Sequence, residues 1–210
     1  MLLRFLVLCA LSLPGAAPAA ADPAPARLLV LGDSLSAGYG IPVEQGWVAL
    51  LAGRLQQAGH PYRVVNASIS GDTTAGGLRR LPPLLAEHRP ELVLIELGAN
   101  DGLQGLPLET VRDNLLRLVE LAQASARAVL LIGVRMPPNY GPRYAAGFAE
   151  LFRAVAQRRG VPLVPALLAG VGERFELLQQ DGLHPLAEAQ PLLLDNVWPE
   201  LVPLLNPATD

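Results

Sequence analysis

The chain has 210 residues and a formal net charge of −3, and all 16 of its basic side chains are arginines. The absence of lysine excludes nucleotide binding through a P-loop lysine, Schiff-base chemistry and a lysine general base. The length predicts one domain, and nucleic acid is not an expected partner because no run of arginines exceeds two residues and no clustered basic face is expected.

The first residues resemble a secretory signal peptide. Met1 to Arg4 carry one positive charge, an apolar run follows, and small residues end at Ala21. The apolar run is shorter than the roughly 20 residues that span a bilayer, so no stable membrane anchor is expected. We expect cleavage near Ala21, with 22–210 as a single periplasmic or secreted domain; an uncleaved anchor is the alternative. Cys9 would leave with the signal, which excludes a thiol nucleophile, cysteine-bound zinc and an internal disulfide.

Apolar runs alternate with amphipathic patterns along the rest of the chain. Strands are predicted at 27–31, 62–67, 92–97, 128–134 and 161–164. Helices are predicted at 47–58, 74–88, 111–122, 145–159 and 187–205, the last one kinked or shortened by Pro199 and Pro203. Continuous apolar strands are typical of parallel strands covered on both faces. The alternation therefore predicts an α/β protein, a three-layer α/β/α sandwich with a five-stranded parallel sheet.

Polar residues gather where the predicted strands end, which is where such sheets bind ligands. Ser34 follows the first strand, Gly71 the second and Asn100 the third. Asp181 and His184 precede the closing helix, three residues apart. Each segment alone is a weak signal, because glycine and asparagine are ordinary turn residues.

Together these groups supply the parts of an acyl-transfer site. Ser34 is the predicted nucleophile, His184 the general base that takes its proton, and Asp181 the carboxylate that orients the imidazole. The backbone N–H groups of Ser34 and Gly71 and the side-chain amide of Asn100 are predicted to form an oxyanion hole. No metal or cofactor is expected.

The same segments resemble the blocks of the SGNH, or GDSL, hydrolase family. The match is closest to its secreted multifunctional thioesterase I/protease I/lysophospholipase group. Ser34 matches the serine of the first block, Gly71 the glycine of the second and Asn100 the asparagine of the third. Asp181 and His184 match the pair of the last block. The resemblance implies a flavodoxin-like fold, metal-free hydrolysis of esters and thioesters, and a shallow, mobile site that accepts many acyl groups.

The expected substrates are small acyl esters, thioesters and lysophospholipids, and the enzyme is expected to act as a monomer. Because acyl-CoA is cytosolic, export favours lysophospholipids and other acyl esters. A polysaccharide or aryl O-acetyl esterase on the same fold is the nearest alternative. A non-catalytic periplasmic binding protein is a remote one, because such a protein would not need the complete set of catalytic residue types.

Two segments near the predicted site are candidates for substrate binding. Met136 and Pro137 lie in the proline-rich segment 136–142, and Gly102 begins the segment 102–107. We expect these segments to form a semi-rigid wall and a hinged flap along an acyl groove. Ordinary polar loops are the alternative.

Other polar residues are assigned structural roles. Glu96 lies in an apolar strand, and because burial of an unpaired charge is costly, Arg135 is its predicted partner. Asp33 is predicted to hold its loop by hydrogen bonds. His60 and His88 are expected at solvated helix ends, so a histidine-based metal site is not expected.

Overall fold

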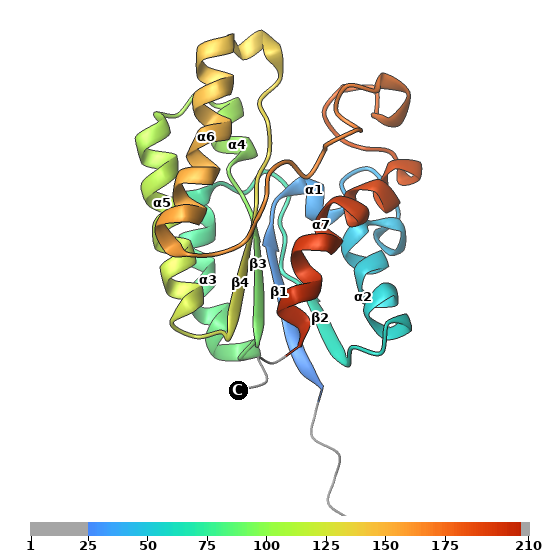
Figure 1. The fold of residues 1–210 in the computed structure, drawn as a ribbon. Helices are drawn as coiled ribbons and strands as arrows, with labels where there is room; N and C mark the ends of the chain where they lie inside the picture. The colour runs from blue at the N-terminus through green and yellow to red at the C-terminus, as the bar shows by residue number, and fades with distance from the viewer. Residues whose placement is uncertain (1–24, 207–210) are drawn as a thin grey trace, which may run out of the picture.

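The computed structural model describes residues 25–206 and has three layers (Figure 1). The middle layer is a parallel sheet with the strand order β2-β1-β3-β4-β5. Helices α3, α5 and α6 cover one face, and α2 and α7 cover the other. This is the flavodoxin-like order, and the predicted fold class is confirmed. The strands are β1 (Ala26–Gly32), β2 (Tyr62–Asn66), β3 (Leu92–Glu96), β4 (Ala128–Ile132) and β5 (Leu163–Val164).

The helices fall into two groups by length. The long ones are α2 (Trp47–Gln57), α3 (Thr74–His88), α5 (Leu108–Gln123), α6 (Pro142–Arg159) and α7 (Gln190–Leu205). The short helices α1 (Ser34–Ala37) and α4 (Ala99–Leu103) follow β1 and β3 at the carboxyl edge of the sheet. Neither short helix was predicted, because four or five residues are too few to display a helical period.

The two central strands are buried because helices cover both faces. In β1, Leu28 to Leu31 are fully inaccessible, and all of β3 is buried. The edge strand β2 is only partly buried. The parallel strands point the same way, so β1, β2 and β3 all deliver their following loops to one edge.

The last helix is not shortened by its prolines. It runs without interruption through Pro199 and Pro203 to Leu205. Both prolines are on the exposed side, so water can satisfy the carbonyl groups that lose an N–H partner there. Leu194, Val197 and Leu201 keep the opposite side buried, and this packing holds the helix together.

The predicted signal peptide, its cleavage near Ala21 and Cys9 all lie outside the described residues. Within 25–206, no helix is long and apolar enough to cross a membrane.

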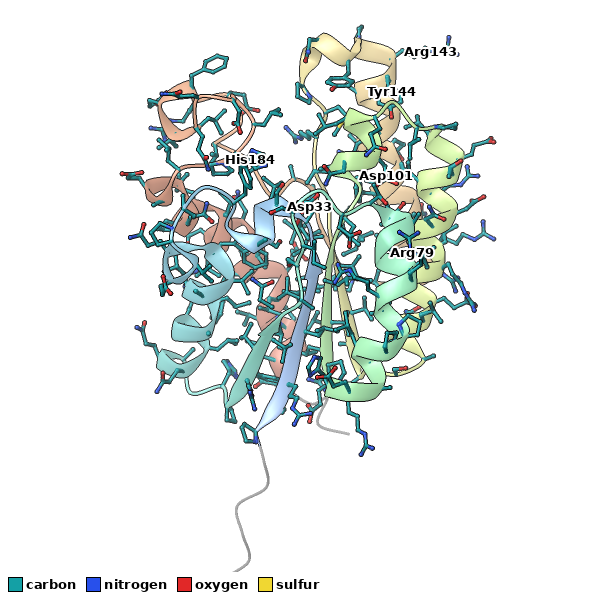
Figure 2. The ribbon with its side chains drawn as sticks, turned by 180° about the vertical axis from the view of Figure 1, so that it is seen from behind. Asp33, Arg79, Asp101, Arg143, Tyr144 and His184 are labelled. Atoms are coloured by element: carbon teal, nitrogen blue, oxygen red, sulfur yellow. The ribbon has the colours of Figure 1, made fainter. Side chains whose placement is uncertain are left out.

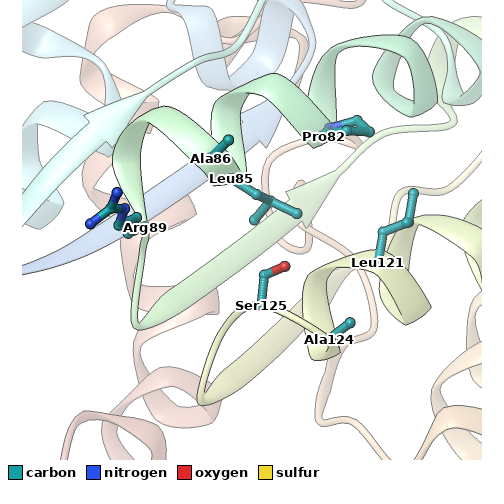
Figure 3. Close-up of a pocket in the computed structure, with 7 residues that line it drawn as sticks. All are labelled: Pro82, Leu85, Ala86, Arg89, Leu121, Ala124 and Ser125. Atoms are coloured by element: carbon teal, nitrogen blue, oxygen red, sulfur yellow. The ribbon is translucent and has the colours of Figure 1, made fainter.

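A pocket lies on the surface away from the predicted site. It measures about 400 Å³ and lies between α3 and α5, with Leu85, Leu121 and Arg89 among its lining residues (Figure 3). Both helices end there, just before β3 and β4 begin. The cavity is therefore at the amino edge of the sheet, opposite Ser34.

The contact of α3 with the sheet depends on Gly77. A Cβ atom there would lie 2.3 Å from Leu97 Cδ1. We expect Gly77→Ala to lower the free energy of unfolding by about 1–3 kcal/mol, because the core must shift to accept the methyl group. Urea unfolding measures this effect.

Gly53 provides the matched control, because it is also a helical glycine but has no atom within 4 Å of an added Cβ. Gly53→Ala should raise the free energy of unfolding by about 0.5–1 kcal/mol through helix propensity alone. Equal stability of the Gly77→Ala variant and the unchanged protein would contradict the tight packing of α3.

Candidate active site

The turn between β1 and α1 places Ser34 at the carboxyl edge of the sheet. Asp33 caps α1, and its Oδ1 accepts a hydrogen bond of 3.0 Å from the backbone N–H of Leu35. The turn requires glycine at position 32 because the Ser36 side chain lies against it: a Cβ atom on Gly32 would be 2.7 Å from Ser36 Cβ. Ser34 is consequently the first residue of the helix, and only Asp33 separates it from the strand.

Ser34, His184 and Asp181 form one hydrogen-bonded chain. Ser34 Oγ lies 2.9 Å from His184 Nε2, and His184 Nδ1 lies 2.6 Å from Asp181 Oδ2. The other carboxylate oxygen of Asp181 accepts the backbone N–H groups of Leu183 and His184, at 2.9 and 3.0 Å. The short turn 181–184 therefore orients the carboxylate toward the imidazole.

The charge of Asp181 sets the direction of these hydrogen bonds. Partial burial raises the pKa of Asp181, but the hydrogen bonds from His184 and Leu183 outweigh it and lower this pKa to about 2. The ionised carboxylate can only accept, so it favours the tautomer with the proton on Nδ1. Nε2 is then free to accept the hydroxyl proton of Ser34.

Three neighbouring strand ends bring the predicted oxyanion-hole residues to the same edge. Gly71 lies in the loop after β2, which is tied to β1 by a 3.1 Å hydrogen bond from the N–H of Ile69 to the carbonyl of Gly32. Gly71 has φ +80°, a backbone conformation that favours glycine. Asn100 lies in α4, and its Nδ2 donates to Asp33 Oδ2 at 3.2 Å.

The same Asn100 nitrogen donates to the carbonyl of Asp72 at 2.9 Å. Both amide hydrogens are thus engaged, one by the residue that precedes Ser34 and one by the residue that follows Gly71. These contacts fix the plane of the amide between the loops that carry Ser34 and Gly71. As expected from the sequence, the Asp33 side chain holds its loop, and Figure 2 shows it close to His184.

Glu96 does not pair with Arg135, and that prediction is wrong. Glu96 Oε2 accepts Ser36 Oγ–H at 2.7 Å and the backbone N–H of Asp33 at 3.3 Å, while Arg135 is exposed. The reason is the register of the sheet: Glu96 lies opposite Gly32, whose missing side chain leaves room for it over the end of β1.

The candidate substrate-binding residues lie together but are largely enclosed. Gly102 is in α4 and not in a loop, and an added Cβ would lie 2.4 Å from the sulfur of Met136. Met136 is only 7% exposed, and Pro137 is partly buried. The side chain of Tyr140 ties the two segments, because its hydroxyl donates to the carbonyl of Leu103 at 3.2 Å.

A second tyrosine makes an equivalent link. Tyr144 donates to the carbonyl of Leu106 at 3.0 Å, and Figure 2 shows it above Asp101. The segments after β3 and β4 are therefore joined at two points. The expected wall and flap are hydrogen-bonded to each other in this structure.

Tyr39 is a site residue that the sequence pattern missed. Its ring centroid lies 4.5 Å from that of His184, and 52% of the residue is exposed. Gln179 holds it by donating Nε2–H to the Tyr39 carbonyl at 2.8 Å. No sequence signal links these residues, since they come from opposite ends of the chain.

Several large apolar side chains near the carboxyl edge are exposed. They occur in the segments that also carry Tyr39, Gly71 and His184. Phe175 is 80% exposed, and the others are Val43, Ile69 and Leu183. Among residues 25–206, no group of three or more His, Cys, Asp or Glu side chains is placed to hold a metal ion.

Comparisons with known proteins identify the family of the chain. The family described as "GDSL-like Lipase/Acylhydrolase family" matches residues 30–190. The chain is 56% identical to "Esterase TesA" of Pseudomonas aeruginosa, over 85% of this chain and 89% of the relative. It is 43% identical to "Thioesterase 1/protease 1/lysophospholipase L1" of Escherichia coli K12, over 90% of this chain and 87% of the relative.

The chain also resembles a solved esterase structure in its fold. The psychrotrophic esterase EstA from Pseudoalteromonas sp., in a crystal structure inhibited by monoethylphosphonate, superposes with a TM-score of 0.81. It is 41% identical, and the match covers 86% of this chain and 99% of that one.

Proposed function

The chain belongs to the GDSL-like lipase/acylhydrolase family and is an ester hydrolase, and from this premise we propose that it is an exported serine enzyme acting through an acyl-enzyme on Ser34. The observation that carries the proposal is the continuous chain from Ser34 Oγ through His184 to Asp181, with distances of 2.9 and 2.6 Å. Such a chain lets a neutral hydroxyl attack, because a base takes its proton as the new bond forms.

Acylation begins when Ser34 Oγ attacks the carbonyl carbon of the ester or thioester. The hydroxyl proton moves to His184 Nε2, and the carbonyl oxygen becomes an oxyanion. As the tetrahedral intermediate collapses, the bond to the leaving oxygen or sulfur breaks and His184 gives that atom its proton. Asp181 remains ionised throughout and stabilises the imidazolium.

Deacylation repeats these steps with water. His184 takes a proton from water as the water oxygen attacks the acyl carbon, and returns the proton to Ser34 Oγ as the acid leaves. The oxyanion of both intermediates would be bound by the N–H groups of Ser34 and Gly71 and by Asn100. Since both Asn100 hydrogens already have acceptors, one must be shared with the oxyanion.

The substrates we propose are acyl esters and thioesters with an apolar chain, lysophospholipids among them. The exposed apolar side chains Ile69, Phe175 and Leu183 occur in the segments that carry the site and suit contact with acyl groups. Met136, Pro137 and Gly102 would line the acyl groove after a rearrangement of their enclosed segments. The proposed signal peptide would export the enzyme and separate it from cytosolic acyl-CoA.

Covalent labelling with a phosphonate ester tests the nucleophile. We expect one equivalent to bind, with the added mass on the peptide that contains Ser34, because the attacking oxygen is trapped as a stable tetrahedral phosphonate. The Ser34→Ala variant should take up no label. Labelling of another serine would overturn the mechanism.

A panel of aryl esters, lysophosphatidylcholine and acyl-CoA of graded chain length tests the substrate class. We expect kcat/KM to favour acyl chains of about eight carbons or more over acetyl, because each buried CH₂ contributes about 0.8 kcal/mol. Preference for acetyl esters would favour the alternative, a carbohydrate or aryl O-acetyl esterase.

A further inference from the structure

Two fully buried carboxyl groups lie beneath the site. Asp33 and Glu96 are both 0% exposed and stand at the ends of the adjacent strands β1 and β3. Glu96 Oε2 accepts two hydrogen bonds, from Ser36 Oγ and from the backbone N–H of Asp33. Glu96 Oε1 is buried and has no donor within the part of the chain that the structure describes. A carboxylate oxygen in that position would lose its hydration without compensation.

Asp33 is the link between this pair and the predicted oxyanion hole. Its Oδ1 accepts the N–H of Leu35, and its Oδ2 accepts Asn100 Nδ2–H. Asp33 therefore has to remain an acceptor for the amide of Asn100 to keep its orientation. Whether Asp33 can remain an acceptor depends on which of the two carboxyl groups, Asp33 or Glu96, carries a proton.

The charges around the pair oppose double ionisation. Burial and the Asp33 charge raise the pKa of Glu96 well above its usual value. Burial raises the pKa of Asp33 to about 6, against the lowering effects of the Leu35 N–H, a hydrogen bond with Glu96 and the nearby His184. Asp72, whose carboxylate is paired with Arg80, adds a further negative charge facing Asp33.

We propose that the buried pair carries a single proton, which resides on Glu96 Oε1 and is donated to the Asp33 carboxylate, and that Glu96 is thereby a positioning residue for Asn100. The proposal uses the one polar atom of the pair that otherwise has no partner. It rests on the proposed function in one respect, the role of Asn100 as an oxyanion donor.

The proton has two consequences for the reaction. It keeps Asp33 ionised and accepting, so the Asn100 amide keeps the orientation set by its two acceptors. It also leaves one negative charge instead of two beneath the place where the oxyanion develops. A second buried charge there would raise the energy of the tetrahedral intermediate.

Infrared spectroscopy tests the protonation state without relying on activity. In the Ser34→Ala background we expect the carbonyl stretch of a protonated carboxylic acid at neutral pH, and its loss in Ser34→Ala with Glu96→Gln. Absence of this band at neutral pH, or its persistence after the Glu96→Gln change, would overturn the proposal. Because this readout needs no turnover, it is unaffected if the proposed function fails.

Kinetics test the positioning role. We expect Glu96→Leu, which cannot donate to Asp33, to lower kcat about tenfold to a hundredfold with KM nearly unchanged, since misorientation of a transition-state donor acts on kcat. Glu96→Gln can donate through its amide and should recover most of that loss. A folded Glu96→Leu variant with full kcat would contradict the positioning role, and so would a Glu96→Gln variant as impaired as the leucine variant.

Stability gives a third readout that holds even if Glu96→Leu does not fold. The ordinary pKa of a glutamate side chain is 4.5, and above that pH Glu96 loses its proton in the unfolded chain but keeps it in the folded protein. The free energy of unfolding therefore falls as the pH rises above 4.5. Glu96→Gln lacks this proton. Its stability relative to the unchanged protein should therefore increase from pH 5 to pH 8 in urea unfolding, and a pH-independent difference would contradict the proposal.

Discussion

Replacing Ser34 with alanine is expected to lower kcat on an aryl ester by about 10⁶-fold, the scale on which a serine nucleophile and its base act as a unit. Ser34 Oγ is the atom that lies 2.9 Å from His184 Nε2, and alanine has no oxygen to attack the carbonyl. Purified variant and unchanged protein would be compared under single-turnover and steady-state conditions. The fold should be unaffected, because the hydroxyl is not part of the core.

Two further variants make this result specific. Ser125→Ala, at the amino edge of the sheet beside the α3–α5 cavity, should keep full activity. Combining Ser34→Ala with His184→Ala should cost hardly more than either change alone, because the base has no role without the nucleophile. If Ser34→Ala kept most of the activity, the acyl-enzyme mechanism would be wrong.

The second large effect is expected from Asp181→Asn, which should lower kcat by about 10⁴-fold. The carboxylate oxygen 2.6 Å from His184 Nδ1 can only accept, whereas an amide nitrogen in its place would donate. The imidazole would then carry its proton on Nε2, facing Ser34 Oγ, and could not act as the base. The measurement is kcat across the neutral pH range.

The pKa of Asp181 adds a check on stability. Folding lowers the pKa of Asp181 from its ordinary value of 3.8 to about 2. The ionised carboxylate therefore stabilises the folded protein above pH 3.8, and this stabilisation is lost as the pH falls from 3.8 toward 2. Asp181→Asn should remove that part of the acid dependence of unfolding. Asp113→Asn, an exposed change on α5, should leave kcat unchanged. Near-normal activity of Asp181→Asn would contradict the orienting role.

Much of the fold follows from local pattern. The apolar runs of β1 and β3 and the helical periods of α3 and α5 predict the parallel sheet and its outer layers. The sequence also predicts that the residues at the strand ends lie together, because parallel strands deliver their loops to one edge. Short elements escaped this reasoning, since α1 and α4 are too brief to show a period.

Pairings across the sheet could not be obtained this way. Arg135, at the end of the fourth predicted strand, is the predicted partner of Glu96 because burial of an unpaired charge is costly. The partners of Glu96 in the structure are set instead by the register that places it opposite Gly32. The tilted ring contact between Tyr39 and His184 joins opposite ends of the chain. The continuation of α7 through its prolines depends on which side of the helix faces water.

The sequence by itself determined the order of strands and helices, the family resemblance and the set of groups for ester hydrolysis without lysine or cysteine. These depend on residue type and on periodicities of a few residues, which are local properties. Only the tertiary structure decided which of the other polar atoms meet: Asp33 with Asn100, Asn100 with the carbonyl of Asp72, and the buried Glu96 with Ser36. Hydrogen bonds and charge interactions change within one ångström, and that precision comes from the packing of the whole chain.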